Sequence, residues 1–313
     1  MAGTSAPEPP LWCGRLWRAG AQGRSWFILN AQPVAPVWLG GSVISDRIRA
    51  IDSLINSSFL NPGDEGLAHL FKDLKERPKI DSPEQLLEIL DKSAIGACVV
   101  SIMEPAHAAW VGEAHQRYPK KILPAMIVNP LNGMDEVRRV VDYHEEYGLR
   151  CLRIPPFRYK LPPTDRVYWP FYVKAIELDM AVSMNAGMPG PRLPGWVQNP
   201  IYYDEVAFHF PELHLIMTHC GQPWIDEAIS TIAHWDNVYM SCCAVAPKYW
   251  REDFVHFINT RGKEKMMFGT EYPTIPWARA RDEIDALALR PQVASLFFVE
   301  NAKRAYRWEA DTE

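Results

Sequence analysis

The sequence lacks several features that would assign it to common functional classes. It contains no apolar run of 18 residues or more, so it predicts no membrane-spanning helix. Its formal net charge is -5, which argues against a nucleic-acid partner because such a partner requires a basic surface. The first 17 residues lack the apolar segment of a secretory signal. We therefore expect a cytoplasmic protein with neither a nucleic-acid nor a membrane partner.

The cysteines are scattered and form no metal-binding or redox motif. The sequence has 6 cysteines, and no two of them are spaced as C-x-x-C. Most lie in apolar runs, where a cysteine behaves as a small hydrophobic residue. This pattern excludes a zinc knuckle and is typical of a reducing compartment.

What the sequence does have is a regular alternation of two patterns. Short apolar runs, typical of strands buried on both faces in a parallel sheet, cover 48–55, 96–103, 122–128, 149–154, 180–185, 213–219, 238–245 and 265–271. Segments with helical spacing of apolar residues cover 82–94, 133–148, 169–179, 202–210, 224–235, 249–258, 278–287 and 291–306. The helix over 82–94 begins with a capping box, in which Ser82 caps and Gln85 reaches back.

This alternation predicts a single α/β domain with the (β/α)8 barrel fold, also called a TIM barrel, over residues 47–313. A length of 313 residues suits one such barrel, which needs about 250 residues before insertions. A doubly wound open sheet is disfavoured because no glycine-rich phosphate loop follows a predicted strand. Residues 1–46 show no sustained period and are expected to form an irregular N-terminal extension.

Polar residues lie at or near the carboxyl ends of the predicted strands, at the edge where a barrel places its active site. In chain order they are Asp52, Asn56, Glu104, Asn129, Arg153, Asn185, His219, Cys242 and Glu271. Buried polar groups need partners, so this many inward polar groups predict a pocket for a small-molecule substrate. We expect the loops over 157–168 and 188–199 to set the substrate, and Trp224 to line the mouth.

Three segments carry a resemblance to a known family. They are "LIMTHCGQPW" (215–224), "MMFGTEYPTIPWARARDEIDAL" (266–287) and "FFVENAKRAY" (297–306). Together they resemble the amidohydrolase superfamily, in the branch of aminocarboxymuconate-semialdehyde decarboxylase and related hydrolases. In that branch the sixth strand ends in His-x-Gly, the eighth in Gly-Ser/Thr-Asp-x-Pro, and the last helix carries Glu-Asn-Ala. The resemblance implies a hydrolase or decarboxylase acting on a small carboxylated, possibly aromatic, molecule, and it is compatible with a homodimer.

The family's metal ligands are mostly replaced in this chain. The family carries Asp-x-His-x-His on the first strand, and the two histidines fall on Leu54 and Asn56. Its fifth-strand histidine falls on Asn185, whereas the sixth-strand histidine is kept as His219. Its eighth-strand aspartate is Glu271 here. Zinc requires three or four ligands from histidine, cysteine and carboxylate, so we expect no metal cofactor.

The remaining residues suggest acid–base chemistry. His219 is expected to shuttle a proton while Glu271 orients its imidazole, and Asp52 is a third candidate catalytic residue. The alternative is that His219 and Glu271 form a residual hydrogen bond in an inactive site. For Asp52, a structural role is the alternative.

Substrate binding is assigned to Arg153, Asn56, Asn185, Glu104 and Trp224. Arg153 can clamp a carboxylate in bidentate fashion, or else form an ion pair with Glu104 or Asp52. Two other functions remain open: an inactive barrel that binds a ligand or partner, and a metal-dependent hydrolase with an unusual ligand set.

Overall fold

The structure of the protein is a computed structural model, which describes residues 48–57, 80–287 and 289–313. All of these residues belong to one compact unit, 41–313. The predicted N-terminal extension over residues 1–46 lies outside the described residues.

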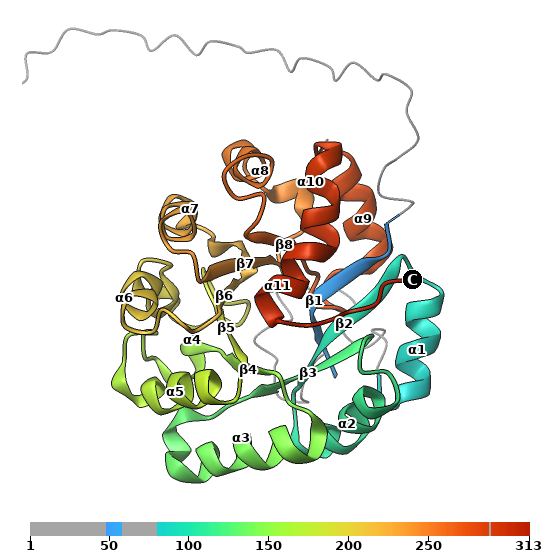
Figure 1. Cartoon of the computed structure of the whole chain (residues 1–313). Coiled ribbons are helices and arrows are strands. Elements are labelled where there is room, and N and C mark those ends of the chain that lie inside the picture. The colour runs from blue at the N-terminus through green and yellow to red at the C-terminus, as the bar shows by residue number, and fades with distance from the viewer. Residues whose placement is uncertain (1–47, 58–79, 288) are drawn as a thin grey trace, which may run out of the picture. The chain divides into compact units, whose positions relative to one another are not determined.

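Eight parallel strands form a single sheet in sequence order, with helices around it (Figure 1). The strands are β1 (Ala50–Asn56), β2 (Ile95–Ile102), β3 (Ile122–Ile127), β4 (Cys151–Ile154), β5 (Ala181–Asn185), β6 (Leu215–Thr218), β7 (Val238–Cys242) and β8 (Met266–Phe268). The ring closes between β1 and the segment after β8, where Glu271 N donates to Leu54 O at 2.8 Å and Asn56 N donates to Tyr272 O at 2.9 Å. The predicted (β/α)8 barrel is confirmed.

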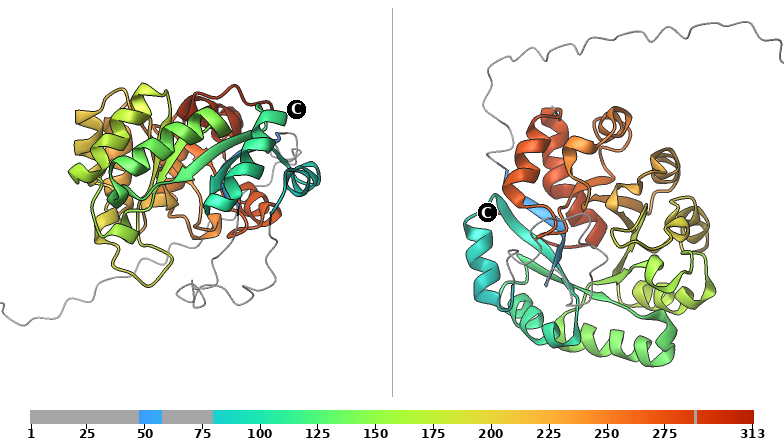
Figure 2. Two further views of the ribbon diagram at one scale, coloured as in Figure 1. Left: turned by 90° about the horizontal axis from the view of Figure 1, so that it is seen from below. Right: turned by 180° about the vertical axis from the view of Figure 1, so that it is seen from behind.

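Helices cover the outside of the ring, as the views from below and behind show (Figure 2). The longer ones are α1 (Pro83–Asp91), α2 (Ala108–Arg117), α3 (Met134–Tyr147), α5 (Trp169–Glu177), α6 (Tyr202–His209), α7 (Ile225–His234), α8 (Glu252–Ile258) and α9 (Trp277–Asp285). The chain ends in α10 (Pro291–Ser295), a π-helical turn over Leu296–Glu300 and α11 (Asn301–Tyr306). No helix among the described residues is long and apolar enough to cross a membrane.

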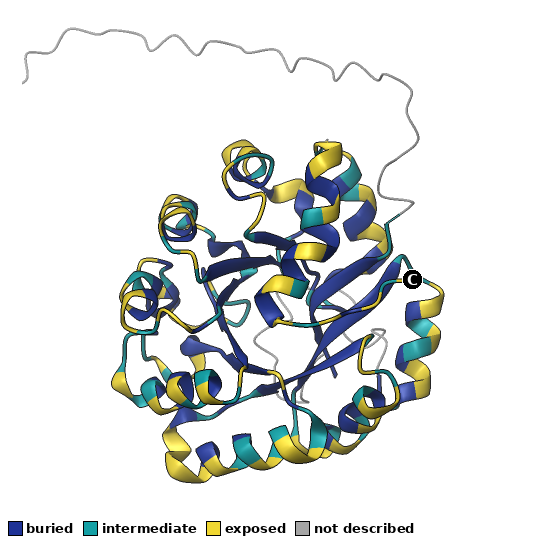
Figure 3. Ribbon diagram, in the orientation of Figure 1, coloured by how far each residue is buried: buried dark blue, intermediate teal, exposed yellow. Residues whose placement is uncertain are grey.

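The strands are buried along their length, except at Ile127 at the end of β3, because helices cover their outer face (Figure 3). Ser82 caps α1 as predicted, since Gln85 N donates to Ser82 Oγ at 3.3 Å. Gln85 reaches back one residue further than in a capping box, because its Oε1 accepts from Asp81 N at 2.8 Å. The helix missing from the sequence prediction is α2. Its buried face consists of Ala108, Val111, Gly112 and Ala114, and such small side chains give a weak apolar period.

Asp52 lies at the closing seam of the barrel. Its Oδ1 accepts hydrogen bonds from Leu54 N at 3.1 Å and Thr270 N at 3.0 Å. Its Oδ2 accepts from Trp277 Nε1 at 2.7 Å and from the Thr270 hydroxyl. Complete burial raises the pKa of Asp52 to about 6, although the hydrogen bonds with Thr270, Leu54 and Trp277 act in the opposite direction. The carboxylate therefore joins β1 to the segment after β8.

We expect Asp52→Asn to lower the free energy of unfolding by about 2 kcal/mol at pH 7, the usual cost of leaving a buried polar group without a partner. All four groups around Asp52 donate, and an amide can offer only one oxygen to them. Urea denaturation of the variant and the wild type measures this difference. An unchanged midpoint and slope would contradict the role of Asp52 in closing the barrel.

Candidate active site

A cavity of about 480 Å³ opens where the carboxyl ends of the strands meet. Polar side chains from five strand ends line it: Asn56, Arg153, Asn185, His219 and Glu271. Active sites of (β/α)8 enzymes lie at this end of the barrel, and the volume suits a small molecule. The cavity is therefore the candidate active site.

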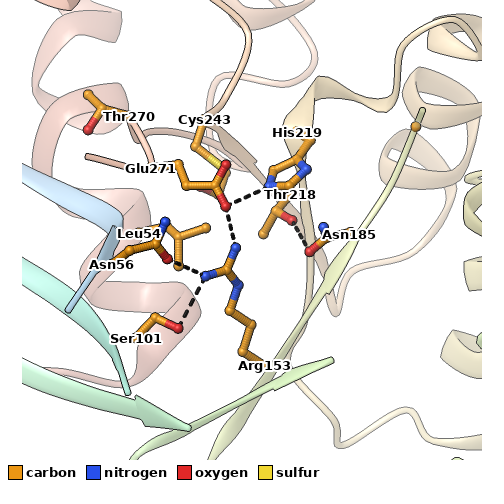
Figure 4. A network of polar contacts seen from close by, with 12 residues as sticks. Leu54, Asn56, Ser101, Arg153, Asn185, Thr218, His219, Cys243, Thr270 and Glu271 are labelled. Atoms are coloured by element: carbon orange, nitrogen blue, oxygen red, sulfur yellow. Dashed lines mark hydrogen bonds and ion pairs between the residues drawn. The ribbon is translucent and has the colours of Figure 1, made fainter. Parts of the chain in front are cut away.

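Arg153 forms the centre of a polar network in this cavity (Figure 4). Its Nη1 donates to Asn56 Oδ1 at 2.6 Å and to Ser101 Oγ at 3.1 Å, and its Nη2 forms an ion pair with Glu271 Oε1. The side chain of Arg153 is only 5% exposed. The alternative prediction, an ion pair between Arg153 and either Glu104 or Asp52, is wrong. Glu271 balances the charge of Arg153 instead.

His219 lies on the other side of Glu271 (Figure 4), with Nε2 at 3.3 Å from Glu271 Oε1. This contact is not aligned as a hydrogen bond, so Nε2 is a buried nitrogen without a hydrogen-bond partner among the described residues. Burial opposes protonation of His219, but the negative charge of Glu271 and the interaction with the Cys243 side chain outweigh burial and raise the pKa of His219 to about 10.

The pKa of Glu271 is shifted in the opposite direction. Burial raises the pKa of its carboxyl, but the positive charges of His219 and Arg153 outweigh burial and lower this pKa to about 2. At neutral pH the cavity therefore holds an ionised carboxylate between an imidazolium and a guanidinium. This arrangement can donate a proton from His219.

The backbone at these strand ends is unusual. His219, Ala244 and Glu271 have positive φ angles of 70°, 64° and 55°. Residues other than glycine adopt this left-handed conformation at a cost of about 1 kcal/mol or more each, and they do so mostly at functional sites. Asn185 is held differently, by the Thr218 hydroxyl, which donates to Asn185 Oδ1 at 3.4 Å.

A family model described as "Amidohydrolase" matches residues 62–308, which is most of the chain. The chain belongs to the amidohydrolase family. As a member, it is an enzyme of the hydrolase or carboxy-lyase type. The resemblance read from the three sequence segments is thereby confirmed. No curated protein matches the chain.

Three solved structures illustrate which proteins share the fold of this amidohydrolase. An uncharacterised TIM-barrel protein from Bordetella bronchiseptica is 20% identical, with a TM-score of 0.66 over 82% of this chain and 98% of the other. A 5-carboxyvanillate decarboxylase from Novosphingobium aromaticivorans, complexed with manganese, is 14% identical, with a TM-score of 0.64 over 86% of this chain and 97% of the other. A probable 2-pyrone-4,6-dicarboxylic acid hydrolase from Acinetobacter baumannii is 13% identical, with a TM-score of 0.55 over 83% of this chain and 100% of the other. At these identities the likeness shows the fold.

The cavity of this amidohydrolase does not fit the divalent metal that the family resemblance implies. Leu54 supplies no donor atom, and Asn56 and Glu271 already bind the Arg153 guanidinium. A second cation between the same two side chains would be repelled by Arg153. Within residues 48–57, 80–287 and 289–313, no three histidine, cysteine or carboxylate side chains cluster as metal ligands do.

The structure brings most, but not all, of the predicted site residues together. His219, Glu271, Arg153, Asn56 and Asn185 line the cavity. In the described part of the chain, the lining does not include Asp52, Glu104 or Trp224. Asp52 is buried at the seam, Glu104 precedes the 3-10 turn Pro105–His107, and Trp224 precedes α7.

Sequence reasoning missed several lining residues on the loops. Phe157 and Arg158 lie in the short helix α4 (Pro156–Tyr159), and Met188 and Leu193 lie in the loop after β5. The sequence did indicate the two loops over 157–168 and 188–199 as the segments that determine substrate specificity. A loop does not have the fixed period of a strand, so the sequence does not show which of its side chains turn inward.

Proposed function

We propose that this protein decarboxylates a small carboxylated, aromatic molecule by acid–base chemistry that needs no metal-activated hydroxide. The similar structures include a decarboxylase and a probable hydrolase of small carboxylated molecules, which supports this class of reaction. The observation that carries the proposal is the pairing of His219 with Glu271 inside a cavity that Arg153 supplies with a fixed positive charge.

His219 is the proton donor in this proposal. A pKa of about 10 keeps its imidazole protonated at neutral pH. Its Nε2 lies beside Glu271 without an aligned hydrogen bond, which leaves the proton free to move to a substrate carbon. Glu271 stays ionised throughout, and its role is to hold His219 in the charged form.

The proposed step balances in atoms and charge. The His219 proton is transferred to the aromatic carbon that bears the carboxylate, which forms a C–H bond and leaves His219 neutral. The C–C bond to the carboxylate then breaks, its electron pair returns to the ring, and carbon dioxide leaves. His219 regains a proton from water, which completes the cycle.

Arg153 and the amide side chains bind the substrate and position it for the reaction. The guanidinium forms an ion pair with Glu271 next to the proton donor His219, so its positive charge stabilises negative charge that develops on the substrate. Asn56 and Ser101 hold the guanidinium in place. Asn185 uses its oxygen to accept from Thr218, and its amide nitrogen is a donor for a substrate oxygen.

Hydrolysis is the second candidate, and the charges of the site favour it less. Attack by water needs a general base, and the only carboxylate that lines the cavity in the described residues is Glu271. Its pKa of about 2 makes it a weak base, since both of its neighbours stabilise the ionised form.

The proposal is tested with protein dialysed against a chelator until metal analysis gives less than about 0.1 equivalent of bound divalent ion. Hydroxylated aromatic carboxylates are supplied in D2O, and the products are followed by mass spectrometry and NMR. We expect release of carbon dioxide from at least one compound, with one deuterium at the carbon that lost the carboxylate.

Two results would contradict the proposal. Activity that returns only after manganese or zinc is added would show a metal-dependent enzyme with an unusual ligand set. Binding of carboxylates without any product would indicate an inactive barrel that serves as a ligand-binding subunit.

A further inference from the structure

The charges of the cavity do not cancel. Its ionisable lining residues are Arg153, Arg158, His219 and Glu271. Arg153 and Glu271 neutralise each other as an ion pair. Arg158 remains as an unbalanced cation at the mouth, and His219 adds a second positive charge when protonated. A positively charged cavity in a chain of net charge -5 favours an anionic ligand.

Arg158 is placed to meet a ligand. It lies in α4 directly after β4, its side chain is exposed, and it takes part in none of the side-chain hydrogen bonds or ion pairs found in the described part of the chain. Neighbouring Arg153, by contrast, uses both terminal nitrogens on Asn56, Ser101 and Glu271. The carboxylate clamp expected of Arg153 is therefore better supplied by Arg158.

The turn that carries Arg158 is fixed to the loop that follows the neighbouring strand β5. Phe157 N donates to Gln198 Oε1 at 3.3 Å, and Gln198 Nε2 donates to Gly187 O at 2.6 Å. Gln198 is fully buried, so this bridge between the loops after β4 and β5 is shielded from water. It holds Arg158 near the loop that carries Met188, on the same rim of the cavity.

The inner end of the cavity offers donors without acceptors. Arg153 Nε is buried and has no hydrogen-bond partner among the described residues, and His219 Nε2 has only the unaligned ion-pair contact with Glu271 Oε1 at 3.3 Å. A buried donor without an acceptor is costly, so both nitrogens favour an oxygen-bearing group of a ligand. Much of the remaining lining is apolar and includes Ile127, Phe157, Met188, Leu193 and Val245.

We propose that Arg158 binds a second carboxylate of the substrate, one that is not lost in the reaction. The substrate is then a small dicarboxylate with an apolar body: one carboxylate lies at the inner donors and reacts, while the other pairs with the Arg158 guanidinium at the mouth. This inference rests on the proposed function for the identity of the reacting group. Arg158 acts in binding and specificity, and it takes no part in proton transfer.

The test compares equilibrium binding of isophthalate, which has two carboxylates, with that of benzoate, which has one. Isothermal titration calorimetry is carried out on the full chain. We expect the wild type to bind isophthalate about tenfold more tightly than benzoate, the size of effect a bidentate charge-assisted contact can give. Arg158→Gln should bind the two probes equally while its affinity for benzoate stays unchanged, and Arg158→Lys should recover part of the preference.

Arg192 supplies a matched control. It lies in the loop after β5, is exposed and is not part of the cavity lining, so Arg192→Gln changes the net charge equally without touching the site. The preference for isophthalate should survive in this variant. The inference is overturned if the wild type shows no preference, if Arg158→Gln keeps it, or if Arg192→Gln loses it. Binding does not require turnover, so these outcomes are independent of the decarboxylation assay.

Discussion

Replacement of His219 by asparagine is expected to lower kcat by about 10³-fold, the usual contribution of a positioned general acid. Asparagine has no titratable proton, so the proposed transfer to the substrate carbon cannot occur. Glu271 and Arg153 remain paired in this variant, because their contact does not involve His219. Substrate affinity should change far less than turnover.

The barrel should stay folded in His219→Asn. The backbone of His219 has a φ of 70°, and asparagine is among the few residues other than glycine that adopt this conformation readily. The variant should therefore keep the circular dichroism spectrum and cooperative unfolding of the wild type. Loss of activity can then be separated from loss of structure.

The same variant should have a changed dependence of stability on pH. The pKa of His219 is raised from 6.5 to about 10 in the folded protein, so its stabilising contribution is complete below pH 6.5 and is lost as the pH rises through 10. His219→Asn should lack this decline between pH 6.5 and 10 in urea denaturation. His209→Asn, a change at an exposed position of α6, should retain it. A His219→Asn variant with full activity would remove the proposed mechanism.

Replacement of Arg153 by methionine is expected to lower the free energy of unfolding by about 3 to 5 kcal/mol at pH 7, the usual cost of leaving a buried charge without its partner. Glu271 would keep only His219 as a counter-charge, and Asn56 Oδ1 and Ser101 Oγ would lose their donor. Turnover should also fall, since no fixed cation would face the reacting group.

Acid titration provides a second measurement on Arg153→Met. In the wild type, the pKa of Glu271 is lowered from 4.5 to about 2, so its stabilisation is present above pH 4.5 and is lost as the pH falls toward 2. Without Arg153 the pKa of Glu271 should be lowered less, so the variant should lose less stability below pH 4.5 than the wild type does. Arg153→Lys keeps the positive charge but not the planar, forked guanidinium. Its stability should therefore lie between that of Arg153→Met and that of the wild type. Equal stability of Arg153→Met and the wild type would show that the network contributes nothing.

The fold was predictable from the sequence because its signals are local. Each strand is a short apolar run, and most helices have long apolar side chains at helical spacing. The exception, α2, buries mainly alanine and glycine, whose small surfaces give little hydrophobic contrast. The strand-end residues of the site were predictable as well, because the carboxyl ends of parallel strands converge in a barrel.

What the sequence could not predict depends on contacts across the ring. Arg153 and Glu271 are 118 residues apart, and only closure of the barrel makes them partners. Asp52 was assigned to the pocket as a polar residue near the end of the first strand, but the register of β1 against β2 shifts between Asp52 and Ile55. This irregularity breaks the two-residue period, and Asp52 lies at the seam.

The guanidinium of Arg153 has a consequence for how the site comes into being. The positive charge of Arg153 is part of the chain and reaches the site when the protein folds. In the proposed mechanism the enzyme is therefore active as soon as β4 and β8 have joined the ring. No metallation step would separate the newly made protein from the working one. Scarcity of trace elements would then leave its activity untouched, whereas anything that loosens the barrel would disable it at once.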